Sequence, residues 1–110
     1  MAPRLAAEFW VRAYLRRLQL AGIPAFVVRR GDAVAGAVLV RLDWLDGRSG
    51  VWQRSFDPVS GGRVWMVLAE GDEAEADAVI ARQTGFDPDL WVIGVEDRAG
   101  RHLLGENGLE

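Results

Sequence analysis

The feature that most constrains the fold is a short apolar run late in the chain, residues 90–95 (LWVIGV). Continuous apolarity, in place of alternation, is typical of a strand that is covered on both faces. Pro88 cannot continue a helix, and Gly85 suits a helix C-cap that needs positive φ. The pattern therefore predicts a helix that stops near Thr84, then a turn, then an interior strand against which the rest of the chain packs.

An amphipathic helix is predicted from Arg4 to Ala21, ended by Gly22 and Pro24. Arg17 falls on the apolar side of the helical wheel, so its side chain either reaches to water, which we favour, or pairs with a carboxylate. The polar stripe of this helix consists of Arg4, Glu8, Arg12, Arg16 and Gln19, and the opposite face of Ala6, Trp10, Ala13 and Tyr14.

A second helix is predicted to begin after Asp72, which suits an N-cap, with Glu75 placed to complete a capping box. Apolar and polar residues follow at helical spacing up to Gln83. A connection of this length permits parallel pairing between the strand before the helix and the strand after it. The helical spacing is carried by Ala76, Val79, Ile80 and Gln83.

Four strands are predicted between the helices, and their short connections favour an antiparallel meander. The first two form a hairpin around GDAVAG, in which Gly31 and Asp32 turn the chain and Gly36 is a bulge or a point of close approach. In the third strand, Trp52, Arg54 and Phe56 share one face, and Val51, Gln53 and Ser55 the other. The strands span residues 25–30, 37–42, 51–56 and 63–69, with turns at 46–50 and at Pro58, Ser60, Gly61 and Gly62.

The C-terminal part is predicted to turn at residues 98–100 into a short strand, His102–Leu104, and to end in a frayed tail at 105–110. The expected fold class is α+β, with an N-terminal helix, a four-stranded antiparallel meander, a second helix, a central strand and a short final strand. All 110 residues form a single domain in this interpretation.

Composition excludes several classes of function. The net charge of -3 and the pI of 5.1 disfavour a nucleic-acid partner, because phosphate binding depends on clustered positive charge. The absence of cysteine excludes disulfides and thiolate metal sites, and the absence of lysine excludes Schiff-base chemistry and a P-loop lysine. The chain has no apolar run of the roughly 20 residues that a membrane helix needs, so a soluble cytoplasmic protein is expected.

Three segments carry a resemblance to a known family: RAYLRRL at 12–18, RRGDAVAG at 29–36, and ARQTGFDPDLWVIGVEDRAGRH at 81–102. On these residues the chain resembles a family of small bacterial proteins known as domain of unknown function 1491. The resemblance spans nearly the whole chain, and the block at 81–91 is its most specific part. It implies one soluble domain and supplies no activity, cofactor or catalytic residue.

The most conspicuous polar cluster is Arg82, Asp87 and Asp89, next to Trp91. Two nearby carboxylates could ligate a divalent cation or divide acid and base roles. Asp before proline is also ordinary turn chemistry, which we favour. We therefore predict a structural clasp in which an aspartate pairs with Arg82 beside Trp91. Farther on, Glu96 and Asp97 should point to opposite faces of the strand and lie in solvent.

His102 is the only histidine. A hydrolytic triad would require a nucleophile in an elbow of the G-x-S-x-G type, which surrounds none of the hydroxyl residues. Zinc would have to be held by one histidine and carboxylates, which is uncommon. A surface histidine without metal or cofactor is therefore expected. The hydroxyl residues considered are Ser49, Ser55, Ser60 and Thr84.

Trp10 and Trp91 are predicted in the core, whereas Trp44, Trp52 and Trp65 lie on or beside strands. The second group either packs beneath the first helix, forms a protein contact, or stacks nucleic-acid bases, and the acidic composition disfavours the last. The charged neighbours that raise this question are Asp43, Arg54 and Arg63.

The sequence favours a non-enzymatic interaction domain that associates with a protein partner or with itself, through a sheet edge or a tryptophan-bearing face. The alternative is a small enzyme or ligand-binding protein that uses Arg82, Asp87, Asp89 and His102. An enzyme requires these groups to converge in a concave pocket, whereas an interaction domain requires an apolar patch.

Overall fold

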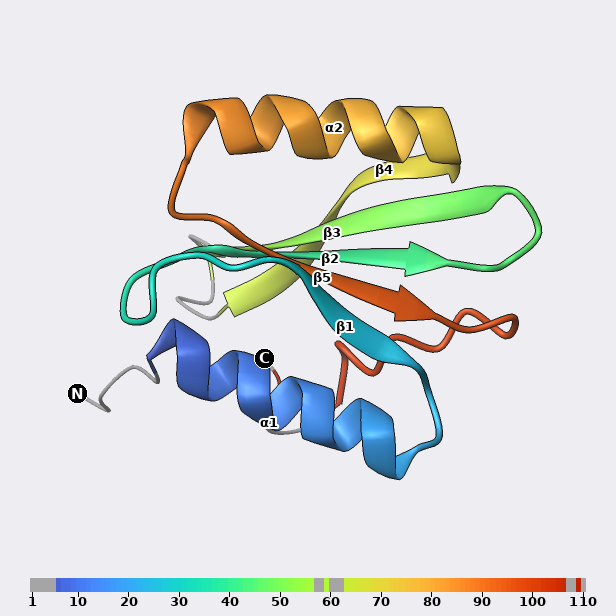
Figure 1. The fold of residues 1–110 in the computed structure, drawn as a ribbon, viewed down its shortest axis with the longest axis horizontal. Coiled ribbons are helices and arrows are strands. Elements are labelled where there is room, and N and C mark those ends of the chain that lie inside the picture. The colour runs from blue at the N-terminus through green and yellow to red at the C-terminus, as the bar shows by residue number, and fades with distance from the viewer. Residues whose placement is uncertain (1–5, 57–58, 60–62, 107–108, 110) are drawn as a thin grey trace.

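The computed structural model describes residues 6–56, 59, 63–106 and 109. Two helices lie on opposite faces of one five-stranded sheet (Figure 1), which confirms the α+β class. Neither helix in these residues is long and apolar enough to cross a membrane. The elements are α1 (Ala7–Leu20), β1 (Ala25–Arg29), β2 (Val38–Asp43), β3 (Arg48–Phe56), β4 (Arg63–Asp72), α2 (Glu73–Phe86) and β5 (Trp91–Glu96).

The apolar run forms β5, an interior strand of the sheet order β1-β5-β2-β3-β4. Its residues are buried up to Val95, as predicted for a strand covered on both faces. β5 pairs antiparallel with β1 and parallel with β2. The parallel pairing is possible because α2 returns the chain to the opposite end of the sheet.

The predicted hairpin between the first two strands is wrong, because β5 lies between β1 and β2. The remaining part of the meander, β2-β3-β4, is antiparallel as expected. A strand that is apolar on both faces is favoured in the interior of a sheet, with another strand on each side. β5 takes such a position between β1 and β2, so these two strands do not pair with each other. The loop between β1 and β2 therefore crosses the end of β5, and a Cβ on Gly36 would lie 2.6 Å from the carbonyl oxygen of Asp89. This close approach is the role predicted for that glycine.

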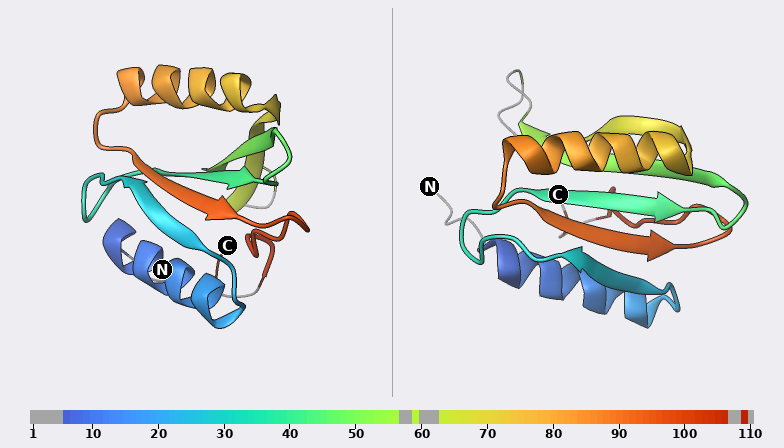
Figure 2. Two further views of the ribbon diagram at one scale, coloured as in Figure 1. Left: turned by 45° about the vertical axis from the view of Figure 1, so that its right-hand side comes forward. Right: turned by 45° about the horizontal axis from the view of Figure 1, so that its top comes forward.

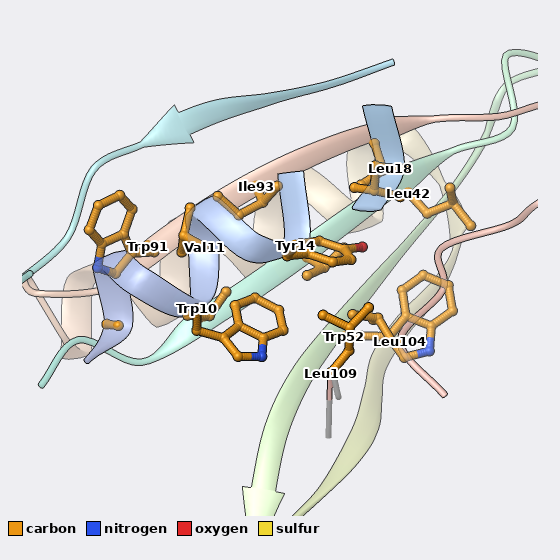
Figure 3. Close-up of a cluster of buried hydrophobic side chains, with 14 of the residues drawn as sticks. Trp10, Val11, Tyr14, Leu18, Leu42, Trp52, Trp91, Ile93, Leu104 and Leu109 are labelled. Carbon is orange, nitrogen blue, oxygen red and sulfur yellow. The ribbon is translucent and has the colours of Figure 1, made fainter. Parts of the chain in front are cut away.

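The larger core lies between the sheet and α1. Trp10, Tyr14 and Leu18 of the helix pack against Trp91 and Ile93 of β5 (Figure 3). Arg17 pairs with Glu106 at 3.0 Å, so the carboxylate alternative for this residue is correct. α1 begins at Ala7, and the Arg4 of the predicted polar stripe lies outside the described residues.

The chain after β5 completes this core. His102–Leu104 is not a strand, and Leu103 takes a positive φ of 61°. The predicted frayed tail is also wrong for Leu109, which is 1% exposed and whose carbonyl accepts a hydrogen bond from Trp65 Nε1 at 3.3 Å. Tyr14 Oη donates to the His102 carbonyl at 2.8 Å. Residues 101–106 and Leu109, the C-terminal strap, thus cover sheet residues that α1 does not reach (Figure 3).

A smaller core lies between the sheet and α2. The predicted N-cap is confirmed, because the Asp72 side chain accepts from the Glu75 amide at 2.8 Å. The helix does not stop at Thr84 but continues through Gly85 to Phe86. It ends instead at Asp87, which takes extended angles because the residue before a proline avoids the helical region. The buried members of this core are Leu39, Val51, Ala76, Leu90 and Val92.

Candidate binding groove

Asp87 and Asp89 belong to a turn that locks the start of β5 to the loop after β1. The Asp89 amide donates to Asp87 Oδ1 at 3.0 Å, which is the turn chemistry predicted. The Asp32 amide donates to the Asp89 carbonyl at 2.9 Å, and Trp91 Nε1 donates to the Asp32 carbonyl at 2.7 Å. Arg29 Nη2 donates to the Pro88 carbonyl at 2.7 Å. The Asp87 carboxylate and the backbone groups of the turn thus stabilise the fold, while the Asp89 side chain is exposed.

Arg82 does not join this turn. It is exposed on α2, and in the part of the chain that the structure describes it forms no hydrogen bond or ion pair. The predicted ion pair with Arg82 is wrong because the helix continues past Gly85. Five residues at about 100° each place Asp87 about 140° around the helix axis from Arg82, so the two side chains point in different directions. The guanidinium beside Trp91 belongs to Arg30, 5.2 Å from the ring centroid.

His102 lies apart from that turn, against the core beneath α1. Its ring centroid is 4.8 Å from that of Trp52, and its Nδ1 accepts a hydrogen bond from the Leu104 amide at 3.0 Å. Burial lowers the pKa of this imidazole. No hydrogen bond joins it to Ser49 or Thr84, while Ser60 and the side chain of Ser55 are outside what the structure describes. The residues of the alternative hypothesis therefore do not converge on one pocket.

The three strand tryptophans pack against the core beneath α1. Trp52 is only 8% exposed, and its ring centroid lies 6.2 Å from that of Trp44. The Arg54 guanidinium lies 4.6 Å from the ring of Trp10 and 5.5 Å from that of Trp65. Trp52 thus belongs to the core, and Trp44 and Trp65 are partly buried against it.

A concave surface that the sequence did not predict lies on the other face of the sheet. A groove with a volume of about 450 Å³ separates α2 from β1 above β5. Its apolar walls are Phe26 and Val28 of β1, 48% and 54% exposed, and Ile80 and Ala81 of α2. Asp43 and Glu96 lie among the polar residues of its lining. We call this surface the α2–β1 groove.

Two features of the fold leave the groove open. α2 runs over β3 and β4 and leaves β1 and β5 to one side (Figure 2). β5 also has no side chain at Gly94, and the Phe26 ring lies where one would begin, since a Cβ there would be 2.7 Å from Phe26 Cε2. The signal in the sequence was this single glycine inside an otherwise apolar run.

The polar lining of the groove is mainly acidic. Arg41 forms an ion pair with Asp77 of α2. Asp43 accepts a hydrogen bond from the Leu45 amide at 2.7 Å, and the Glu96 carboxylate is half-buried nearby. The lining thus contains three carboxylates and one guanidinium, which leaves an excess of negative charge. The prediction that Glu96 and Asp97 lie in solvent is wrong for Asp97, whose side chain is only 11% exposed and pairs with Arg101 at 3.0 Å.

The lining offers little for catalysis. It contains no cysteine, histidine, hydroxyl or lysine side chain. Within the described residues, no three metal-ligating side chains gather closely enough to hold an ion. The arrangement of apolar walls with excess negative charge is suited to binding an apolar group that carries a cation.

Comparison with known proteins identifies relatives over nearly the whole chain. The model of the family described as "Protein of unknown function (DUF1491)" matches residues 5–105. A crystal structure of a DUF1491 family protein from Caulobacter crescentus CB15 is 41% identical, with a TM-score of 0.85 over 94% of this chain and 97% of that one. An NMR structure of a DUF1491 family protein from the same organism is 40% identical, with a TM-score of 0.82 over 96% of both chains.

A more distant structure, that of protein Atu0922 from A. tumefaciens, is 31% identical, with a TM-score of 0.73 over 86% of both chains. No curated protein matches the chain. The resemblance inferred from the three sequence segments is confirmed by the family match.

Proposed function

The chain belongs to the DUF1491 family, which is described only as proteins of unknown function, and we propose that it works as a non-enzymatic protein-interaction domain. The observation that supports this function is the α2–β1 groove, an apolar surface left open beside a single helix. Apolar side chains that are exposed together and rimmed by polar residues are a common feature of protein interaction sites.

The occupant we propose is an amphipathic helix of a partner protein that carries lysine or arginine. Such a helix lies beside α2 on the uncovered half of the sheet and places its apolar residues against Phe26, Val28 and Ile80. Its basic residues meet Asp43 and Glu96, whose charge Arg41 does not balance because Arg41 is paired with Asp77.

A helix fits this surface better than a small molecule does. The groove lies open to solvent along one side of α2, whereas pockets for small ligands enclose most of the ligand surface. The missing second helix would also complete the layer over a five-stranded sheet that has one helix on this face.

The test is an NMR titration with a synthetic amphipathic peptide of leucine and lysine, about 15 residues long so that it can hold a helix. We expect the amide signals of Val28, Ala81 and Gly94 to shift. The Val28→Glu variant should lose binding because it places a charge on the apolar wall, and Glu96→Lys should lose it by repulsion.

The matched control is Val34→Glu, which adds the same charge at a side chain that is 73% exposed on the loop after β1 and outside the groove. It should bind the peptide as the parent protein does. Equal binding of a leucine–glutamate peptide, or shifts elsewhere on the protein, would contradict the proposed function.

Self-association is a second candidate, and β4 is the element that favours it. This edge strand carries no charged residue from Val64 to Ala69, and the side chains of Met66 and Val67 are half exposed. Edge strands that avoid pairing usually carry charges. Sedimentation velocity at micromolar concentration should show a dimer that Met66→Lys dissociates, and a monomer at every concentration would exclude this candidate.

A further inference from the structure

The outer edge of β1 is a second surface, and its backbone is ready to pair with another strand. The Glu96 amide donates to the Pro24 carbonyl at 3.0 Å, so these two residues form a hydrogen-bonded pair. Hydrogen-bonded and non-hydrogen-bonded pairs alternate in an antiparallel ladder. Phe26, which is opposite Gly94, therefore also points its amide and carbonyl at β5. The amides and carbonyls of Ala25 and Val27 consequently point away from the sheet.

These outward groups have no backbone partner elsewhere in residues 6–56, 59, 63–106 and 109. Val27 is 43% exposed, so water reaches this edge. Proteins usually protect such an edge by covering it or by placing a charge on the strand itself. From Ala25 to Val28 the strand has neither a charge nor a proline, and its one charged residue, Arg29, donates to the Pro88 carbonyl beside β5. The edge can therefore accept one more strand.

Positive charge flanks this edge on the α1 side. A cavity of about 510 Å³ lies between α1 and the start of β1, with Arg12 and Arg16 on its helical wall and Ile23 and Ala25 on the other. Both guanidinium groups are exposed. Their partners are an exposed ion pair to Glu8 and a hydrogen bond to Gln19.

The single negative charge of Glu8 does not neutralise the positive charge beside the start of β1. Arg30 also binds its carboxylate, at 2.8 Å, so one acid is shared by two guanidinium groups. The hydrogen bond from Arg30, together with the charge of Arg12, lowers the pKa of Glu8. With Arg16 included, three positive charges face one negative charge beside the open edge.

We propose that β1 accepts an extended acidic segment of a partner protein as a sixth strand of the sheet. The segment hydrogen-bonds to the outward groups of Ala25 and Val27. Its alternate side chains on the α1 face are aspartate or glutamate and bind Arg12 and Arg16 as carboxylates. This inference goes beyond the proposed function, because it concerns a different surface and a partner of opposite charge.

The same charges disfavour a second copy of the chain as the occupant. In a two-fold antiparallel pairing of β1 with β1, the continuous sheet has both α1 helices on one face. Arg12 and Arg16 of the two copies would then lie near each other, and like charges across an interface are unfavourable. A strand with acidic side chains would instead be attracted to Arg12 and Arg16.

The test compares two peptides of about six residues, the usual length of a strand. One alternates valine with glutamate, and the other has lysine in place of every glutamate. Amide hydrogen exchange is followed by NMR on the full chain. We expect the valine–glutamate peptide to slow exchange at Val27 and Ala25, and to bind about tenfold more tightly than the lysine peptide, as charge-assisted contacts should provide.

Two variants sharpen the test. Val27→Pro removes the outward amide, which an edge strand tolerates, and should abolish binding while the thermal midpoint stays in the range of a folded protein. The double variant Arg12→Glu, Arg16→Glu should reverse the preference to the lysine peptide. Arg82→Glu, a single charge reversal on α2 and so on the opposite face of the sheet, should leave the preference unchanged, whereas Arg12→Glu alone, the same change in net charge, should weaken it. Equal binding of both peptides, no protection at Val27 with either, or protection that grows with protein concentration alone would each overturn the proposal.

Discussion

The two faces of the sheet differ in how completely the chain covers them. On the α1 face, the helix and the C-terminal strap together bury Trp52, Trp91 and Leu104. On the α2 face, a single helix over β3 and β4 leaves Phe26 and Val28 half exposed. The first face therefore holds the larger core, and the second combines a smaller core with apolar surface left in contact with solvent.

The largest expected effect tests this contrast directly. Trp91→Ala removes a side chain that is 1% exposed on the α1 face, and its free energy of unfolding should fall by about 3 to 5 kcal/mol. Phe26→Ala, its counterpart on the α2 face, should cost less than about 1.5 kcal/mol because half of the ring is already in water. Urea denaturation measures both, and equal costs would show that the two faces contribute equally.

The next effect concerns the turn before β5. Arg29→Ala should destabilise by about 1.5 to 3 kcal/mol, because it removes a hydrogen bond from a charged group to the Pro88 carbonyl. Arg82→Ala should change stability by less than about 0.5 kcal/mol, since that side chain is exposed on α2. Denaturation of the two single variants distinguishes them, and a larger loss for Arg82→Ala would restore the clasp predicted from the sequence.

The pH effect closest to neutrality should come from His102, which packs against the core on the α1 face. Burial lowers the pKa of His102 from its ordinary value of 6.5, so below that pH the unfolded chain binds a proton that the folded protein resists. Stability should therefore be complete above pH 6.5 and fall as the pH drops through the interval below it. The carboxylates of Glu8, Asp46 and Asp97 also have lowered pKa values, so they act in the same direction but nearer to their ordinary values of 4.5 and 3.8.

The control for this effect is His102→Asn, whose side-chain oxygen can still accept from the Leu104 amide but does not titrate. Its stability should not change between about pH 7.5 and about pH 5.5, an interval above the ordinary range of carboxylates. A pH dependence that survives in this variant would assign the effect to another group.

The smallest change in stability is expected from Gly94→Ala. A methyl group relieves the conformational cost of glycine in a strand, about 0.5 to 1 kcal/mol, but pushes against the Phe26 ring, so the two effects nearly cancel. The same methyl narrows the α2–β1 groove, and binding of the leucine–lysine peptide should weaken while the unfolding midpoint stays near that of the parent. Undiminished binding would show that the peptide does not enter the groove.

The sequence allowed prediction of features that depend on local chemistry. Asp72 was predictable as a helix cap because its contact with Glu75 is three residues away, and β5 because its apolarity is continuous. The pairing of β1 with β5 was not predictable, because short connections favour neighbours in sequence and the register depends on where β5 enters the sheet. Leu109 looked like part of a polar tail because one apolar residue carries no periodicity.

The groove was missed for a related reason. Its residues come from β1, β2, α2 and β5, which are distant in sequence, and no single segment shows a pattern of polar and apolar residues typical of a site. The sequence instead indicated Asp87 and Asp89, although the Asp87 carboxylate hydrogen-bonds to the backbone of its own turn. The strand order determines which carboxylates lie beside the groove, and the order depends on contacts across the whole fold and cannot be read from one segment.

The position of β5 also determines when the molecule can fold. β1 is made early during synthesis, yet its only partner in the sheet is the last strand, and β2 likewise borders that strand. Pairings between segments so far apart in sequence must close long loops, which slows folding. Until the ribosome has released residues 91–96, β1 has no strand to pair with, so the sheet is completed as a late event that requires nearly the whole chain.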